Sequence, residues 1–271
     1  MSPENAPVTL DIPGLPTGLR LYTHDDSDRI ISETLRRTHI WEPYETKLTV
    51  DLLQPGDVFV DVGANIGYYT VIAAQRVGPH GKVYAYEPDP RNFALLEKNI
   101  ALNGLHNVAL FPCALYDDNR NGKLYVSGDN YGDHRIYDSA DDRTHHDITL
   151  VHGGNHLGQH TQRINFLKVD TQGSEFYVIN GLRSLLEQNR QHLSMVLEFS
   201  PWGIRRSGAD AHALVDMLEQ LGLTLYIIDH IDARLIPAEP YHLHDWVKEL
   251  ASEPDNEGFI NLLLTPRPVS G

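Results

Sequence analysis

Four acidic residues stand at or near the ends of apolar runs, where a carboxylate could do chemistry. Asp61 lies in "DVFVDV", Glu87 ends "KVYAYE", Asp170 ends "INFLKVD" and Glu198 lies in "LSMVLEFS". Burying an acid on so apolar a segment is costly unless it is paired or faces a site. The pattern therefore predicts one cleft whose acids hold a polar ligand.

The turn "DVGANIG", residues 61–67, follows the first of these runs and leads into a helical pattern. Gly63 and Gly67 let the backbone turn sharply and approach a ligand, and the next helix offers unpaired N–H groups to an anion. The spacing is G-x-x-x-G, with Asn65 where the dinucleotide fingerprint G-x-G-x-x-G has its second glycine. The turn therefore disfavours NAD.

The two acids beside this turn indicate the kind of ligand. Asp61 would repel a diphosphate and attract an ammonium or sulfonium group. Glu87 ends the second strand, where an acid accepts hydrogen bonds from both ribose hydroxyls. A ribose, a cation and a carboxylate together predict S-adenosylmethionine as cofactor. The alternative is a tight strand-to-helix turn in some other α/β protein.

These acids must be positioned by a sheet, and the chain predicts one. Strands that are apolar on both faces alternate with amphipathic helices, which is typical of a parallel sheet covered on two sides. We predict an α/β fold with a Rossmann-like, doubly wound, seven-stranded sheet, closed by an antiparallel strand near 258–266. The expected strands are 57–62, 82–87, 107–112, 164–170, 193–200 and 223–229, and the expected helices are 68–77, 91–104, 175–189 and 209–222.

Two segments break this alternation. Residues 1–45 are rich in proline and polar residues, with one helical stretch near 27–39, and are predicted to cap the single large domain of residues 46–271. Residues 116–163 form a polar insertion that contains several glycines and six histidines. An insertion of this length usually covers a site or is disordered.

Composition limits the partners. The 271 residues carry a formal net charge of −15, which repels nucleic acid and anionic membranes, so a small-molecule acceptor is expected. Cys113 is the single cysteine, which excludes an internal disulfide, and the N-terminus has neither a basic start nor an apolar run. No stretch approaches the roughly 20 apolar residues that span a bilayer. A cytoplasmic protein is expected, and its oligomeric state is left open.

Three segments resemble the FkbM-type methyltransferases: "PGDVFVDVGANIGYYT", "VYAYEPDPRNFALLEKNIALNG" and "LKVDTQGSEFYVINGL". The likeness covers about residues 42–200, and the insertion does not match it. It implies the class I methyltransferase fold and an S-adenosylmethionine-dependent enzyme that methylates hydroxyls of sugars, polyketides or other natural products. By this resemblance the methionine-side loop is Gly63, Ala64, Asn65 and Gly67, the ribose site is Glu87 and Pro88, the adenine edge is Ala114, and in "WEPYET" Thr46 or Glu42 reaches the cofactor.

Methyl transfer to an alcohol is an in-line displacement that a positioned base could accelerate about 10²–10⁴-fold. Asp170 is our first candidate for the base or for a group that positions the acceptor, and it also lies beside the cofactor. Glu198 is the second candidate. Glu175 either takes part in catalysis or holds N–H groups at a helix start, with Ser174 as cap.

The histidines offer weaker candidates. His134, in "DNYGDHRIY", is the one residue of the insertion that we predict as a neutral-pH acid or base, and the alternative is a self-stabilised turn. His152, His156 and His160 have the spacing of a helical zinc site, but neighbouring glycines argue against that helix. His230 is a further acid/base candidate, and no metal is predicted.

Other functions remain open beside O-methylation. The same cofactor could serve N-methylation of a small molecule, and the same fold could serve an NAD-dependent oxidoreductase, which the glycine spacing disfavours. A cofactor-binding regulator without catalytic activity is the third alternative, and Asp170 and Glu198 argue against it.

Overall fold

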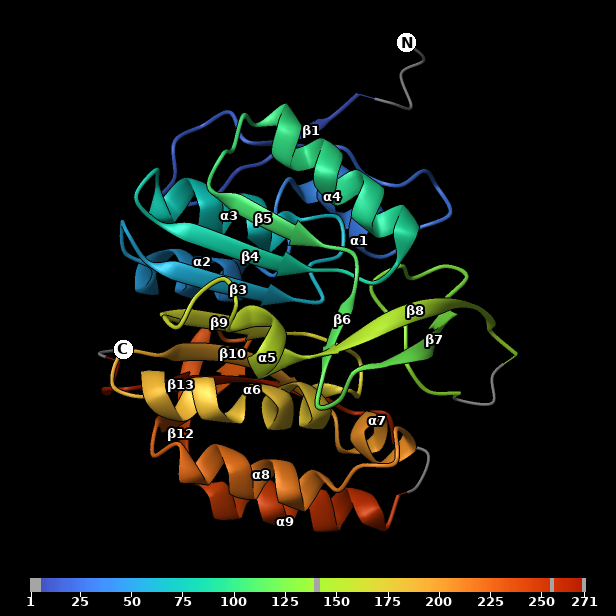
Figure 1. The fold of residues 1–271 in the computed structure, drawn as a ribbon, viewed down its shortest axis with the longest axis vertical. Coiled ribbons are helices and arrows are strands. Elements are labelled where there is room, and N and C mark those ends of the chain that lie inside the picture. The colour runs from blue at the N-terminus through green and yellow to red at the C-terminus, as the bar shows by residue number, and fades with distance from the viewer. Residues whose placement is uncertain (1–5, 139–141, 254–255, 270–271) are drawn as a thin grey trace.

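The computed structural model describes residues 6–138, 142–253 and 256–269. Its centre is an eight-stranded sheet in the order β12-β11-β13-β10-β9-β3-β4-β5 (Figure 1). The strands are β3 (Val58–Val62), β4 (Lys82–Tyr86), β5 (Val108–Phe111), β9 (Phe166–Val169), β10 (Ser194–Phe199), β11 (Thr224–Asp229), β12 (Arg234–Ala238) and β13 (Ile260–Thr265).

The strand directions confirm the predicted doubly wound sheet. Strands β5, β4, β3, β9 and β10 pair in parallel, and the late strand β13 lies antiparallel to both β10 and β11. The expected count of seven is wrong by one, because β12 adds an antiparallel edge strand to β11. Ile236 and Pro237 of β12 are exposed, so this edge strand lacks the two-faced apolar pattern by which we recognised the others.

Helices cover both faces of the sheet, and each face has its own apolar core. In β3, Phe59 packs into one core while Val60 and Val62 pack into the other, as expected for a strand buried on both sides. None of the helices in the described ranges is long and apolar enough to cross a membrane. One face carries α1 (Ile31–Thr38), α2 (Pro43–Leu52), α3 (Tyr68–Val77) and α4 (Pro90–Leu102), and the other carries α5 (Gly153–Leu157), α6 (Glu175–Asn189), α7 (Pro201–Arg206), α8 (Ala211–Gln220) and α9 (Pro240–Ala251).

The N-terminal segment lies over α4. It forms the short hairpin β1 (Val8–Thr9) and β2 (Arg20–Leu21), followed by the helix α1 that the sequence predicted. The Asn99 side chain on α4 accepts a hydrogen bond from the Tyr22 backbone N–H at 2.6 Å, which fixes the segment to the core.

The insertion is folded rather than disordered in its described part. It contributes a second sheet in the order β6-β8-β7, which lies beyond the ends of β4 and β5, and the short helix α5 (Figure 1). This sheet encloses a small core of its own that includes Leu124 and Leu150. Most of the outward-facing residues of β8 are polar, so the strand lacks the apolar pattern by which we predicted the others. The strands are β6 (Ala114–Tyr116), β7 (Arg120–Val126) and β8 (Thr144–His152).

Candidate active site

The turn after β3 has the shape that its glycines predicted. Gly63 has φ +84°, and a Cβ atom there would lie 2.0 Å from the backbone oxygen of Asp170. Gly67 has φ +91°, and its Cβ would lie 2.6 Å from a side-chain carbon of Leu96. Both positions therefore require glycine, for the backbone angle and for the close approach of neighbouring segments.

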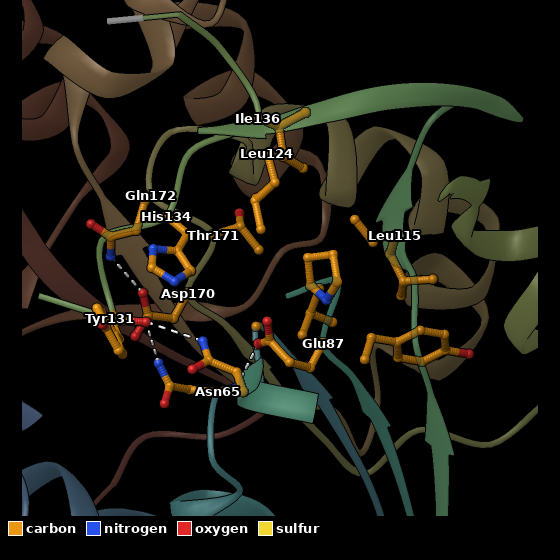
Figure 2. Close-up of a pocket in the computed structure, with 17 residues that line it drawn as sticks. Asn65, Glu87, Leu115, Leu124, Tyr131, His134, Ile136, Asp170, Thr171 and Gln172 are labelled. Atoms are coloured by element: carbon orange, nitrogen blue, oxygen red, sulfur yellow. Dashed lines mark hydrogen bonds between the residues drawn. The ribbon is translucent and has the colours of Figure 1, made fainter. Parts of the chain in front are cut away.

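Asn65 joins this turn to the next strand and to the insertion. It has φ +50°, which asparagine tolerates better than most residues. Its backbone N–H donates to Glu87 Oε2 at 2.7 Å, and its side-chain amide donates to the Tyr131 carbonyl at 2.8 Å (Figure 2). Glu87 also accepts from the Asp89 N–H at 2.8 Å, and burial raises the pKa of Glu87 to about 8.

The first cavity opens beside Glu87, between the strand ends and the insertion (Figure 2). It encloses about 520 Å³ of empty space, part of it open to solvent. Its walls come from the ends of β3, β4 and β9 and from the segment around Tyr131, so the insertion does cover the cleft. The lining residues are Val62, Gly63, Asn65, Tyr86, Glu87, Pro88, Asn92, Ala114, Leu115, Leu124, Tyr131, Gly132, His134, Ile136, Asp170, Thr171 and Gln172.

A second cavity adjoins the first and shares Gly63, Asn65, Gly132, Asp170 and Gln172 with it. Asp170 therefore lies at the boundary between the two spaces. The other residues that line the second cavity are Ile30, Ile31, Trp41, Glu42, Asp61, Ala64, Ile66, Tyr68, Tyr69, Asn130, Lys168, Glu198 and Phe259.

Asp170 and Glu198 are brought together, as the sequence predicted. Gln172 donates from its amide to Asp170 Oδ1 at 2.8 Å and to Glu198 Oε1 at 3.0 Å. The Lys168 ammonium donates to Asp170 Oδ2 at 3.0 Å, so Lys168 is the charge partner of Asp170. Burial and the neighbouring Asp170 raise the pKa of Glu198 well above its ordinary value.

Asp61 faces the second cavity, and its neighbours differ from those we expected. It lies opposite Lys168 in the pairing of β3 with β9, and it accepts from the Thr70 hydroxyl at 2.6 Å. Burial raises the pKa of Asp61 to about 6, while the Lys168 charge opposes this shift. We had expected Asp61 to interact with a positively charged group of the ligand. In the structure, the ammonium group of Lys168 supplies part of that positive charge.

In "WEPYET", Glu42 reaches the cavity and Thr46 does not. Glu42 accepts from the Tyr69 hydroxyl at 2.9 Å, and burial, followed by repulsion from Glu45, raises its pKa to about 8. Thr46 is buried behind Tyr68, with its hydroxyl 3.1 Å from the tyrosine oxygen. The structure therefore does not support a cofactor contact by Thr46. Gly67, likewise, lines neither cavity and serves the turn itself.

His134 lines the first cavity and not the second. Its Nδ1 accepts from the Ser127 N–H at 3.2 Å, and its Nε2 lies 3.9 Å from Asp89 Oδ2. Burial lowers the pKa of His134 to about 4, so the ring is neutral at pH 7. This position, on the wall of the first cavity, does not favour our prediction that it acts as acid or base on the acceptor.

Glu175 serves the local backbone. Its carboxylate accepts from the Thr171 N–H and hydroxyl, both at 3.0 Å, and from the Gly173 N–H at 2.9 Å. It lines neither cavity, and Ser174 makes no side-chain cap. The structure thus favours the alternative of an acid that holds the loop before α6, although without the serine cap.

The histidines 152, 156 and 160 do not share one helix. Contrary to our expectation, a short helix does form at Gly153–Leu157, and the His152 Nδ1 caps it by accepting from the Asn155 N–H. The rings of His156 and His160 are 5.4 Å apart and both pack against Phe111. These contacts place them in a packed layer behind β5.

Sequence reasoning missed two residues that organise the site. Gln172 bridges the two central acids, and the only signal in the sequence was its position two residues after Asp170, at the end of a strand. Tyr131 contributes through its backbone carbonyl, which accepts from Asn65 and from Asn92 at 3.1 Å. A backbone contact between distant segments leaves no signal in residue type.

Comparison with known proteins gives one family match. The model of the methyltransferase FkbM domain matches residues 61–224. "Methyltransferase 1" of Beauveria bassiana is 28% identical over 151 residues, covering 47% of this chain and 59% of that protein. The chain thus spans about six-tenths of this relative.

Solved structures give similar but distant matches. A methyltransferase FkbM from Methylobacillus flagellatus is 12% identical with a TM-score of 0.45, covering 89% of this chain and 61% of that one. The Aeropyrum pernix fibrillarin in complex with S-adenosyl-L-methionine is 11% identical with a TM-score of 0.40, covering 78% and 67%.

Proposed function

Because the chain belongs to the FkbM family of methyltransferases, we propose that it transfers a methyl group from S-adenosylmethionine to a hydroxyl of a small molecule. The net charge of −15 supports a small acceptor over nucleic acid. We also propose that the protein is cytoplasmic. Its single cysteine cannot form an internal disulfide, which agrees with a reducing compartment.

Features of the first cavity fit this cofactor. Glu87 offers a buried carboxylate, held by two backbone N–H groups, to the ribose hydroxyls, and Pro88 and Ala114 lie beside it on the wall. Gly63 lines this cavity, and its lack of a side chain lets the Asp170 backbone pack directly against the turn. We propose that the methionine part follows the turn through Ala64 and Asn65 toward Asp170.

One observation carries the proposal: Asp170 lines both cavities. A group that removes a proton from the acceptor must reach the acceptor while the donor lies within reach of the same oxygen. S-adenosylmethionine supplies the electrophilic methyl when bound. Asp170, fixed by Lys168 and Gln172, orients the acceptor hydroxyl and takes up its proton. Glu198, held beside Asp170 by Gln172, lines the second cavity and helps to position the acceptor.

The experiment compares Asp170→Asn with Asp118→Asn, a matched change at a surface ion pair with Arg120. Small hydroxylated compounds are screened with the wild type for a gain in mass of one methyl group. Asp170→Asn should lower kcat by about 10²–10⁴-fold, and binding of S-adenosylhomocysteine should persist. Asp118→Asn should behave as the wild type.

Three outcomes would contradict the proposal. Turnover of Asp170→Asn at the wild-type rate would remove Asp170 from the catalytic step. Methylation on nitrogen would replace the acceptor class with the amine alternative. Binding of a pyridine dinucleotide, with no binding of S-adenosylhomocysteine, would overturn the choice of cofactor.

A further inference from the structure

A cluster of potential metal ligands lies at the edge of the second cavity. Glu42 and Glu45 come from the start of α2, and His230 follows β11. One carboxylate oxygen from each glutamate and one ring nitrogen of the histidine all lie within 4.8 Å of one another. In particular, His230 Nε2 is 3.7 Å from Glu45 Oε2. Glu45 is 1% exposed, so this is no surface group of acids.

A second observation points independently to a ligand at this place. Asn261, near the start of β13, is 6% exposed, and its Oδ1 is buried with no hydrogen-bond partner in the described part of the chain. Its Nδ2 lies 2.7 Å from Glu45 Oε2 and 3.1 Å from His230 Nε2. The oxygen and nitrogen of an amide exchange places when the group turns by half a rotation. Turned in this way, the amide gives up the hydrogen bond that its Nδ2 donates to Glu45, and the unpartnered oxygen faces the carboxylate and the imidazole in its place.

The spacing of these atoms suits a metal ion. Ligand atoms bonded to one ion at about 2.0–2.2 Å lie about 3.0–3.5 Å from each other. His230 Nε2 and Glu45 Oε2 are 3.7 Å apart, close to that range, and the end of the Asn261 amide that now carries Nδ2 lies 2.7 and 3.1 Å from the same two atoms. The donor set is therefore two carboxylates, one imidazole and one amide oxygen.

We propose that Glu42, Glu45 and His230, with the Asn261 amide oxygen, bind a divalent first-row transition ion such as Mn²⁺ or Zn²⁺. A ring nitrogen among the ligands favours these ions over Mg²⁺ and Ca²⁺, which prefer oxygen alone. Glu42 also lines the second cavity, so the ion lies at the edge of the acceptor space. Its use in orienting the acceptor hydroxyl rests on the proposed function, whereas the binding of the ion does not.

The test measures binding of the metal alone. The full chain is treated with a chelator, dialysed and titrated with Mn²⁺ or Zn²⁺ by calorimetry, and the bound metal is counted by elemental analysis. One ion per chain is expected. Glu45→Gln and His230→Ala should each weaken binding by at least about 10–100-fold, the range seen even for residues that only support a ligand.

Two further variants control for folding and for adventitious binding. Asn261→Asp replaces the neutral amide by a carboxylate and should tighten binding, a gain that misfolding cannot imitate. His244→Ala alters a partly exposed pair in which His244 contacts His212 at 2.8 Å and Asp216 at 3.3 Å. That variant should bind one ion as the wild type does.

The proposal is overturned if the wild type takes up no ion, or if Glu45→Gln and His230→Ala bind it unchanged. It is also overturned if Asn261→Asp binds no more tightly and His244→Ala abolishes uptake. S-adenosylhomocysteine binding, measured in parallel, separates the two proposals. Cofactor binding without metal uptake would refute the metal site alone, and metal uptake without cofactor binding would refute the methyltransferase assignment alone.

Discussion

The two cavities share a wall, yet their acids are held in different ways. On the first side, Glu87 accepts hydrogen bonds from two backbone N–H groups, and Asp89 accepts from the N–H groups of Arg91 and Asn92 at the start of α4. On the second side, most of the contacts come from other side chains. The acids that line it are Glu42, Asp61, Asp170 and Glu198, and Glu45 lies close to Glu42.

The acids of the first cavity are thus held by backbone groups, and those of the second mostly by side chains. Backbone donors are fixed by the turn and by the helix start, so the first cavity depends on backbone shape. Side-chain donors can move or lose charge, so the second cavity depends on the balance between Lys168 and the acids around it. Changes to the turn should therefore impair the first cavity and its binding of the cofactor. Changes of charge should instead destabilise the second cavity.

The largest effect on stability and cofactor binding should come from Gly63→Ala, which disrupts the backbone conformation of the turn after β3. The added Cβ would lie 2.0 Å from the Asp170 carbonyl, and the backbone angle of +84° is unfavourable for alanine. We expect a stability loss of about 4 kcal/mol or more, at the upper end for single substitutions, and no measurable binding of S-adenosylhomocysteine.

Gly78→Ala is the matched control for Gly63→Ala, because Gly78 has φ +69° with no atom within 4 Å of its Cβ position. It should cost about 1 kcal/mol from backbone strain and leave cofactor binding intact. Denaturant unfolding and calorimetry measure both variants. Equal effects of the two changes would show that backbone angle, rather than the close approach to Asp170, decides the outcome.

Lys168→Met should have the next largest effect, on the second cavity. Lys168 is 5% exposed, its ammonium bonds Asp170, and it lies 4.6 Å from the centre of the Tyr69 ring. Removing one partner of a buried ion pair costs about 3–5 kcal/mol. The loss should shrink as pH falls, because protonation neutralises the acids that Lys168 compensates.

Lys47→Met provides the comparison for this charge change. The Lys47 side chain is 57% exposed and pairs with Asp51 one turn along α2, so its loss should cost less than about 1 kcal/mol. Urea unfolding at pH 7 and pH 5 measures both variants. If Lys168→Met unfolds no more easily than Lys47→Met, the second cavity does not depend on this ammonium group.

Much of this contrast could be predicted from the sequence. The apolar strands, the two glycines and the acids at strand ends are local features, and they predicted the sheet, the turn at Gly63 and the meeting of Asp170 with Glu198. The pairing of Lys168 with Asp170 is local in the same sense, because residues two apart in a strand share one face.

What the sequence could not reveal were contacts between distant segments. The Tyr131 carbonyl and the approach of Asn261 to Glu45 join residues far apart in the chain. Glu175 was ambiguous, because an acid at a helix start looks the same whether it holds a loop or faces a substrate. The edge strand β12 was missed because its outer face is exposed.

Glu87 makes the first cavity sensitive to pH. Its pKa of about 8 means that the carboxyl is largely protonated at pH 6 to 7. The ribose hydroxyls donate to the ionised form, so binding releases a proton and affinity should rise as pH increases toward 8. The change should approach tenfold per pH unit, which is about 1.4 kcal/mol.

Titrations with S-adenosylhomocysteine from pH 6 to 9, in buffers of different ionisation enthalpy, count the protons released. Glu87→Gln cannot ionise and should lose most of this pH dependence. An identical slope in the variant would assign the proton to another group, such as the ligand amine.

The smallest effect should come from Tyr131→Phe, which sharpens the claim that the first cavity depends on backbone contacts. The Tyr131 hydroxyl lies 2.9 Å from Ser27 Oγ and 3.4 Å from Arg91 Nη1, while its ring stays available to the Arg91 guanidinium 4.5 Å away. Removing these hydrogen bonds should cost about 0.5–1.5 kcal/mol of stability. Cofactor affinity should change less than about twofold, because the carbonyl that Asn65 contacts remains.

Asn65→Gly completes the comparison with Tyr131→Phe. Glycine accepts the backbone angle of +50° and keeps the N–H that donates to Glu87, but it removes the amide that bonds the Tyr131 carbonyl. Affinity for S-adenosylhomocysteine should then fall by about 1 kcal/mol, the usual worth of one hydrogen bond. A larger loss in Tyr131→Phe than in Asn65→Gly would mean that the tyrosine side chain, rather than its backbone, positions the insertion over the cavity.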